Sequence, residues 1–307
     1  MDAPQQLISS LFRQLTTVIV GKDAQIRDAV TCLLAGGHLL IEDVPGVGKT
    51  TLAHGLARSF GLDFSRVQFT SDLMPSDLMG VSVYEREHQR FVFHPGPLFT
   101  QVLLADEINR ASPKTQSALL EAMEEKQVSV EGETRRLPHP FFVIATQNPN
   151  EQLGTHALPE SQLDRFLMRL RLGYPGRSAE RELLLGQDRR QTMETLPALL
   201  DAARLGVLQQ AVASVQVSDA AIAYLQDLLD ATRNGRWFVQ GLSPRAGLSI
   251  LRAAKARAWL AGRGYVAPDD LADILPQTAA HRLVAAPGAG RGSFEQVQAL
   301  LDAMPLP

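Results

Sequence analysis

Apolar residues along the first half of the chain alternate between strand-like runs and stretches with helical spacing. The strand-like runs are residues 38–41, 64–69, 102–105 and 141–145. Helical stretches include residues 23–35, 50–60 and 113–125, and a further helix–strand unit follows at 160–172. This alternation predicts an α/β fold in which crossover helices join the strands of a parallel sheet.

Two segments interrupt the alternation and have the pattern of β-hairpins. Residues 81–93 place apolar strands around a polar turn, and residues 127–137 turn at Glu131-Gly132-Glu133. From residue 178 onward nearly all of the pattern is helical, apart from a Pro- and Gly-rich stretch at 287–292 that we expect to be an exposed loop. We therefore predict two domains, a sheet-containing core over residues 1–174 and a smaller all-α domain over 175–307.

A Gly-rich turn follows the first strand and opens a helix. In Gly46-Val47-Gly48-Lys49-Thr50, backbone N–H groups and the helix N-terminus can surround a pyrophosphate. Lys49 would reach the β- and γ-phosphates of ATP, and the hydroxyl of Thr50 would bind Mg²⁺. Asp43 stands where the strict pattern has Gly; it tolerates left-handed geometry but adds negative charge near phosphate. The remaining residues expected at the nucleotide are Val44, Pro45 and Thr51.

The strand at 102–105 ends in two acids, Asp106 and Glu107. Asp106 would lie beside the magnesium ion, and Glu107 would orient and polarise the attacking water. The next strand ends near Asn148, whose neutral amide could hydrogen-bond the γ-phosphate and the water without adding charge. Asn-Pro pairs also commonly begin turns, so Asn148 alone leaves both interpretations open.

Two arginines are candidates for stabilising charge during phosphoryl transfer. Arg165 lies beyond the strand at 141–145 and could reach the γ-phosphate on a neighbouring subunit, which requires an oligomer. Arg245 lies just inside a helix of the second domain, after the capping residue Ser243. It could swing toward the phosphates or be an ordinary solvated arginine.

Composition narrows the remaining possibilities. A net charge of -3 and a pI near 6.2 give no bulk attraction to nucleic acid or to an anionic membrane. The single cysteine, Cys32, has the surroundings of a buried small hydrophobe rather than a reactive thiol. The N-terminus lacks a basic region followed by an apolar one, and no apolar run has the length of a membrane span, so we expect a cytoplasmic protein.

Several strings together resemble the MoxR family of AAA+ ATPases. They are LIEDVPGVGKTT at 40–51, QFTSDLMPSDLMG at 68–80, FVFHPGPLF at 91–99, LADEINRASPKTQSALLEAMEEKQ at 104–127 and FFVIATQNPNEQLGTHALPESQLDRF at 141–166. A weaker match, GLSPRAG, continues at 241–247. The resemblance implies a P-loop AAA+ core with hairpin insertions, followed by a helical lid.

The resemblance also implies a role for each candidate residue. Lys49 and Thr50 would belong to the Walker A loop, Asp106 and Glu107 to Walker B, and Val20-Gly21 would border the adenine. Asn148 would be sensor 1, Arg165 the arginine finger and Arg245 sensor 2. Residues 81–93 would be the insertion into helix 2, and residues 127–137 the pre-sensor-1 hairpin.

The family further implies a hexameric ring with ATP sites between subunits and chaperone-like remodelling of other proteins, often with von Willebrand factor A domain partners. A rival hypothesis is a nucleic-acid motor or transcription activator, but the hairpin tips are acidic or mixed in sign. A third is a scaffold that binds ATP and hardly turns it over, which the presence of Glu107, Asn148 and Arg165 disfavours.

Overall fold

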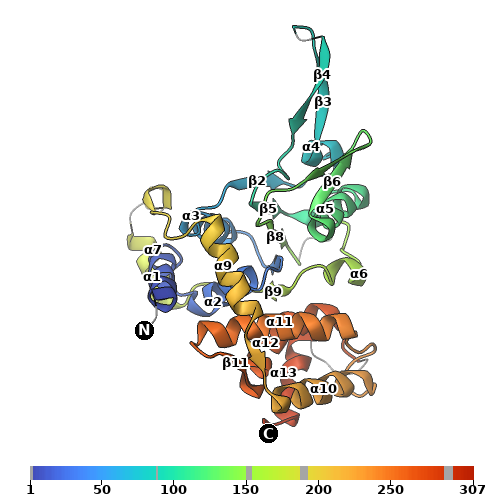
Figure 1. Ribbon diagram of the computed structural model, residues 1–307. Coiled ribbons are helices and arrows are strands. Elements are labelled where there is room, and N and C mark those ends of the chain that lie inside the picture. The colour runs from blue at the N-terminus through green and yellow to red at the C-terminus, as the bar shows by residue number, and fades with distance from the viewer. Residues whose placement is uncertain (1–2, 88, 150–153, 187–192, 287–292) are drawn as a thin grey trace.

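The computed structural model describes residues 3–87, 89–149, 154–186, 193–286 and 293–307. Its centre is a parallel sheet of five strands in the order β2-β5-β8-β1-β9 (Figure 1). The strands are β1 (Leu39–Glu42), β2 (Phe64–Gln68), β5 (Val102–Asp106), β8 (Phe142–Gln147) and β9 (Met168–Leu170). The α/β fold predicted from the alternating pattern is confirmed.

Helices cover both faces of this sheet. One face packs on α1 (Ala3–Val18), α2 (Asp23–Leu34) and α3 (Lys49–Ser59), and the other on α4 (Pro75–Met79) and α5 (Pro113–Glu125). Strand β8 shows the reason: Phe142 and Ile144 belong to the first core, whereas Val143 and Ala145 belong to the second. Because side chains alternate along a strand, an uninterrupted apolar run fills two cores at once.

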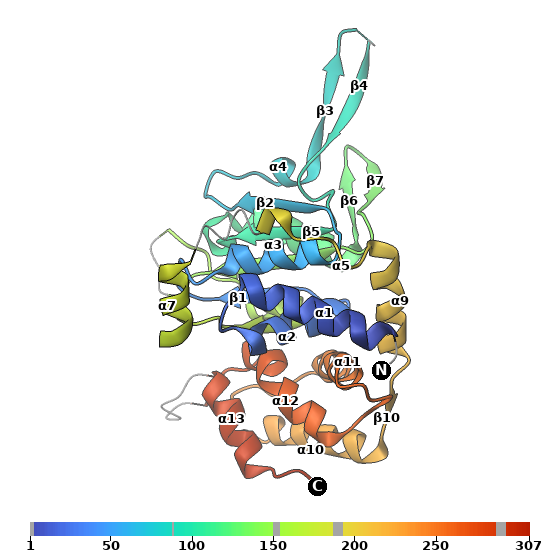
Figure 2. The same ribbon diagram turned by 90° about the vertical axis from the view of Figure 1, so that its left-hand side faces the viewer.

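Both predicted hairpins are present and project from the same end of the molecule (Figure 2). The first pairs β3 (Gly80–Glu85) with β4 (Arg90–Pro95), and the second pairs β6 (Gln127–Val130) with β7 (Glu133–Arg136). The guanidinium of Arg135 lies 4.0 Å from the centroid of the Phe93 ring, so a cation–π contact joins the two hairpins near their bases.

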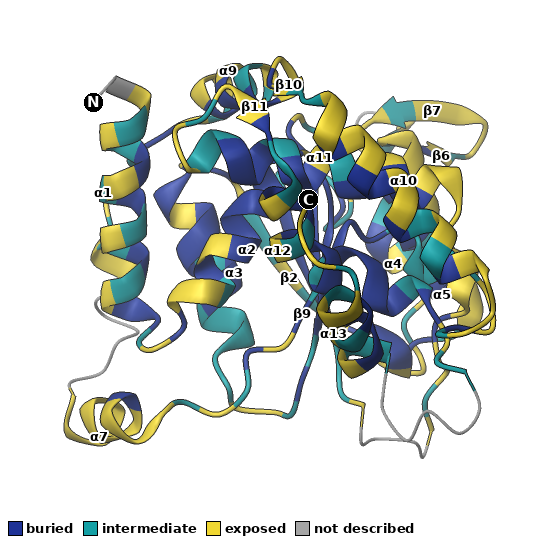
Figure 3. Cartoon of the chain, turned by 90° about the horizontal axis from the view of Figure 1, so that it is seen from below, coloured by how far each residue is buried: buried dark blue, intermediate teal, exposed yellow. Residues whose placement is uncertain are grey.

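The C-terminal part is mainly helical; its helices from residue 219 onward lie beneath the sheet, whereas the helix Arg177–Leu185 lies at the side of the molecule near α1 (Figures 1 and 3). Its helices are α7 (Arg177–Leu185), α9 (Ala202–Ala213), α10 (Asp219–Arg233), α11 (Pro244–Leu260), α12 (Pro268–Ala279) and α13 (Ser293–Ala303). Two short strands, β10 (Gln216–Val217) and β11 (Tyr265–Val266), form a parallel pair that the helical pattern did not predict. Among the described residues, no helix is long and apolar enough to cross a membrane.

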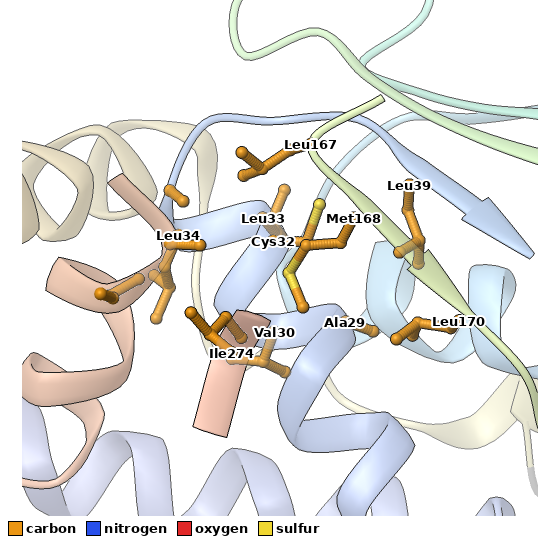
Figure 4. Close-up of a cluster of buried hydrophobic side chains, with 14 of the residues drawn as sticks. Ala29, Val30, Cys32, Leu33, Leu34, Leu39, Leu167, Met168, Leu170 and Ile274 are labelled. Atoms are coloured by element: carbon orange, nitrogen blue, oxygen red, sulfur yellow. The ribbon is translucent and has the colours of Figure 1, made fainter. Parts of the chain in front are cut away.

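The C-terminal helices and the sheet-containing part of the chain share one continuous apolar cluster. Figure 4 shows Cys32 within it, on α2 and close to Met168 of β9, with Ile274 of α12 nearby. Cys32 is fully buried, its Sγ lies 3.3 Å from the carbonyl oxygen of His38, and burial raises the pKa of its thiol. This confirms the prediction of a buried hydrophobe. The proposed boundary at residue 174 stays a prediction, and residues 287–292 lie outside the described residues.

His38 connects three elements at the amino ends of the strands. Its Nδ1 accepts a hydrogen bond from the amide of Val143 at 3.0 Å, and its Nε2 lies 3.2 Å from the carbonyl oxygen of Met123, to which it donates. Burial lowers the pKa of His38 from 6.5 to about 4. The unfolded chain therefore binds a proton more readily than the folded chain between these two values.

Acidification should consequently destabilise the fold through His38. The contribution of neutral His38 to the free energy of unfolding is intact above pH 6.5 and is lost as the pH falls toward 4. Between pH 7 and pH 5 the loss is about 2 kcal/mol. We expect urea unfolding at these two pH values to show a smaller difference for His38→Gln than for the unaltered chain. If the unfolding free energy changed equally with pH in both proteins, His38 would not be the group whose lowered pKa causes the loss of stability.

Candidate nucleotide site

The turn between β1 and α3 has the conformation that a phosphate loop needs. Gly46 and Gly48 have φ values of 83° and 98°, which disfavour any residue with a side chain. A Cβ at either position would have no neighbour within 4 Å, so the requirement is conformational and not one of space. No side chain caps the first turn of α3 among the described residues. That helix N-terminus can therefore receive an anion.

Asp43 has a different role from the one expected at its position. Its φ is not in the left-handed region. Its Oδ1 accepts from the amide of Val44 at 2.8 Å, and its Oδ2 accepts from the amide of Gly173 at 2.6 Å. The carboxylate thus ties the start of the phosphate loop to the connector after β9, and two N–H donors stabilise its charge.

A cavity of about 360 Å³ opens over the loop, between the ends of β1, β2 and β5. Lys49, Thr50, Asp106 and Glu107 all line it, so the structure brings together the predicted phosphate-binding and acidic residues. Nζ of Lys49 donates to the carbonyl of Asp43 at 2.7 Å. Partial burial lowers the pKa of Lys49, while Asp106 raises it.

Buried Thr146 fixes both acids. Its hydroxyl donates to Oδ1 of Asp106 at 2.6 Å and accepts from the amide of Glu107 at 2.9 Å. The second oxygen of Asp106 pairs with Arg66 of β2 at 2.7 Å. The carboxylate of Asp106 is therefore held facing the cavity.

Glu107 is held by separate contacts. Its Oε2 accepts from Nε2 of Gln68 at 2.8 Å and from Arg110 at 2.9 Å. Its backbone has φ 57° and ψ 50°, an uncommon conformation for a residue with a side chain that often marks functional sites. The side chain is three-quarters buried and lines the cavity, which suits a base that acts on one water.

The donor set of this cavity suits Mg²⁺. A hydroxyl from Thr50 and a carboxylate from Asp106 are the oxygen ligands that this ion prefers, since it usually keeps several waters and binds few protein groups. Arg66 would share Asp106 with the ion.

A second cavity, of about 260 Å³, lies on the other side of the same loop. Val20 lines it together with Gly46, Val47, Gly48 and Thr51 of the loop, as expected for the ring of a nucleotide. The other lining residues are mostly apolar: Val18, Ile19, Lys22, Pro175 and Leu183. At Gly21 a Cβ would lie 2.7 Å from the Cβ of Ala179 in α7, so only glycine allows α7 to close over this side.

Asn148 follows directly after β8, the strand between β5 and β1. Asn148 is half-buried and lies at the edge of the sheet where the phosphate loop and the two acids lie. This agrees with the predicted position beside the acid-bearing strand.

The two candidate arginines meet at a different place. Arg165 pairs with Oε2 of Glu124 at 2.8 Å, and Arg245 pairs with Oε1 of the same carboxylate at 3.0 Å. Within the described chain, neither arginine lines the two cavities at the phosphate loop. The structure therefore brings Arg245 to Arg165 and not to the phosphates of its own chain.

Sequence reasoning missed several residues of this site. Arg66 and Gln68 reach the acids because β2 lies beside β5, and no motif indicated that adjacency. Thr146 stands two residues before Asn148, and the alternation of the strand was a usable signal for a side chain at the same edge.

Comparisons with known proteins agree with this architecture. The AAA family, ATPases associated with various cellular activities, matches residues 38–168, and an AAA lid domain matches residues 230–303. A crystal structure from Cytophaga hutchinsonii, of a protein described as a candidate ATPase, superposes with a TM-score of 0.89 at 34% identity, over 99% of this chain and 96% of that one. The fold and the site thus define an AAA+ ATPase with a lid.

Relatives narrow the class further. Chaperone MoxR1 of Mycobacterium tuberculosis is 41% identical over 88% of this chain and 74% of its own length. Protein MoxR of Methylorubrum extorquens is 34% identical over 90% and 87%. The uncharacterized protein YeaC of Bacillus subtilis is 46% identical over 95% and 91%. The chain belongs to the MoxR family of AAA+ ATPases.

Proposed function

We propose that the protein hydrolyses ATP with Mg²⁺ at the 360 Å³ cavity and uses the reaction to remodel partner proteins. The observation that carries the proposal is the convergence of Lys49, Asp106 and Glu107 on that one cavity. The apolar cavity on the other side of the loop fits a nucleotide ring. A single nucleotide lying across the loop would use both.

Each residue then has a distinct task. The loop and Lys49 hold the phosphates, and Glu107 accepts a hydrogen bond from the attacking water and takes its proton. Mg²⁺, when bound, would neutralise charge on the phosphates. Gln68 and Arg110 restrain Glu107, so its carboxylate keeps one orientation before ATP arrives.

Glu107→Gln tests the proposal directly. The amide has the same shape and can still accept from Gln68, but it cannot take a proton from water. We expect ATP binding to persist while hydrolysis falls by about a hundredfold or more. Single-turnover phosphate release and calorimetric titration measure the two quantities separately.

Glu121→Gln is the matched control, because it makes the same chemical change on an exposed position of α5. It should leave turnover unaltered. Normal hydrolysis by Glu107→Gln would remove this residue as the base, whereas loss of ATP binding would show that it supports the fold of the site.

The wider role follows from family membership and from the shared position of Arg165 and Arg245. We place the ATP sites between subunits of a homo-oligomeric ring, six being the expected number, with both arginines facing the neighbour's nucleotide. Clients would be proteins, among them those with von Willebrand factor A domains. We expect the Glu107→Gln protein, loaded with ATP, to retain such a client in a pulldown read by mass spectrometry.

A nucleic-acid motor is the alternative, and it would need cations on the projecting hairpins. The exposed tip of β6–β7 carries Glu131 and Glu133 instead, and the tip of β3–β4 is mixed in sign, with Arg86 next to Glu87. Stimulation of turnover by DNA or RNA would favour the motor, and stimulation by a captured client protein would favour the remodeller.

A further inference from the structure

A third cavity, of about 250 Å³, lies where the core meets the lid. The connector between α6 (Glu160–Leu163) and β9 forms one side, and α11 forms another. Four guanidinium groups surround the cavity, from Arg165, Arg245, Arg252 and Arg282. It is thus a strongly basic cavity built from two parts of the chain that are distant in sequence.

Three of these arginines have acidic partners. Arg165 and Arg245 share Glu124, and Nε of Arg282 donates to Oδ1 of Asp164 at 2.6 Å. Arg282 is 5% exposed and also donates to the carbonyl of Phe166 at 2.8 Å, so it has a structural role next to Arg165.

Arg252 differs from the others. It forms no hydrogen bond or ion pair with any residue that the structure describes. Desolvation lowers the pKa of its guanidinium, and the positive charge of Arg245 lowers it further. Arg252 is an exposed residue of α11, so it adds to the cavity a solvated positive charge that no described acidic side chain pairs with.

The geometry of α11 explains why Arg252 stands beside Arg245. The two residues are seven positions apart, which is two helical turns, so their side chains leave the same face of the helix. With Arg165 and Arg282 nearby, four cations face two acids, Glu124 and Asp164. A cavity with this excess suits an anion with several oxygens, such as phosphoryl groups.

We infer that Arg252 is a third arginine, after Arg165 and Arg245, that contacts the phosphates of the nucleotide bound by a neighbouring subunit. This inference rests on the proposed function, since it needs a ring with ATP between subunits. Because Arg252 has no acid to leave, it can meet the incoming phosphates without breaking an ion pair. Arg165 and Arg245, in contrast, can contact the phosphates only if they weaken or break their ion pairs with Glu124.

The test begins with Arg252→Ala in the full-length protein. We expect its kcat to fall about tenfold, as for loss of one charge-assisted contact, while the calorimetric affinity for ATP falls far less. Arg252→Lys should recover part of the loss because it restores the charge. Arg204→Ala removes an exposed arginine from α9, outside the cavity, and should have no effect.

Mixing tests whether Arg252 acts on the neighbour. Lys49→Ala subunits carry an intact Arg252, and adding them to Arg252→Ala subunits should raise turnover. Lys49→Ala/Arg252→Ala subunits should not raise it. Equal stimulation by both donors, or normal turnover by Arg252→Ala alone, would overturn the inference.

One further measurement separates the possible failures. If Arg165→Ala subunits are rescued by Lys49→Ala subunits but Arg252→Ala has no defect, the ring mechanism stands and only Arg252 is excluded. If Arg165→Ala is not rescued either, the interfacial site itself is wrong.

Discussion

Lys49→Ala should abolish measurable ATP binding while leaving the fold intact. Lys49 is the cation that the phosphate loop itself contributes to the 360 Å³ cavity, and its Nζ is held over the loop by the carbonyl of Asp43. Removing it leaves Asp106 and Glu107 facing the triphosphate with less compensation, so like charges oppose binding. Calorimetric titration with ATP and Mg²⁺ measures the loss.

Two controls make this result specific. Lys114→Ala removes a lysine from an exposed position of α5 and should bind ATP normally. The thermal midpoint of Lys49→Ala should match that of the unaltered chain, because the side chain is only half-buried and donates its hydrogen bond to a carbonyl at the edge of the cavity. Unchanged ATP affinity would refute the assignment of the phosphate site.

The convergence of Lys49 with Asp106 was predictable from sequence because of strand direction. Asp106 ends β5 and Lys49 lies beyond the end of β1, and the carboxyl ends of parallel strands lie at the same edge of the sheet. The order of strands was not needed for that prediction. Strand direction fixes the shared edge, and the distance between the two side chains depends on strand order, in which only β8 separates β1 from β5.

The neighbours of the acids depend on strand order, and the sequence does not encode this order as a local pattern. Arg66 and Gln68 contact Asp106 and Glu107 because β2 pairs with β5 in a register that sets Gln68 opposite Asp106. On another strand, the same two side chains would have been ordinary polar residues. Only the paired sheet shows that they belong to the site.

The contact partner of Arg245 could not be predicted from the sequence either. Its helix start was visible from Ser243 and Pro244, and the structure shows the Ser243 hydroxyl accepting from the amide of Ala246 at 3.1 Å. Local pattern does not fix how a helix packs on a separate sheet. In the folded chain α11 packs on α2, and Arg245 at the start of α11 pairs with Glu124 of α5.

Arg165→Ala should lower turnover by about a thousandfold, the low end for arginine fingers, while ATP affinity falls far less. The guanidinium mainly meets charge that develops during phosphoryl transfer, so its loss affects the transition state more than the bound substrate. Arg165 is one-third exposed and pairs with Glu124, which presents it beside Arg245. Phosphate release under saturating ATP, together with calorimetric affinity, separates kcat from binding.

Arg136→Ala serves as its control, because it removes an exposed arginine of β7 that lies outside the cluster at Glu124. It should leave ATP turnover near that of the unaltered chain. A comparable loss in both variants would mean that the defect of Arg165→Ala reports general disturbance of the hairpins and helices and not a missing finger.

Mixing the two defective chains decides whether Arg165 acts across an interface. Lys49→Ala subunits have no working phosphate loop but carry Arg165, whereas Arg165→Ala subunits have a sound loop and no finger. In a mixed ring, each Arg165→Ala subunit that meets an intact Arg165 on its neighbour forms one complete site, so part of the ATPase activity should return. If the labelled subunits exchange and turnover still does not recover, Arg165 acts within its own chain or not at all, and the interfacial mechanism must be withdrawn.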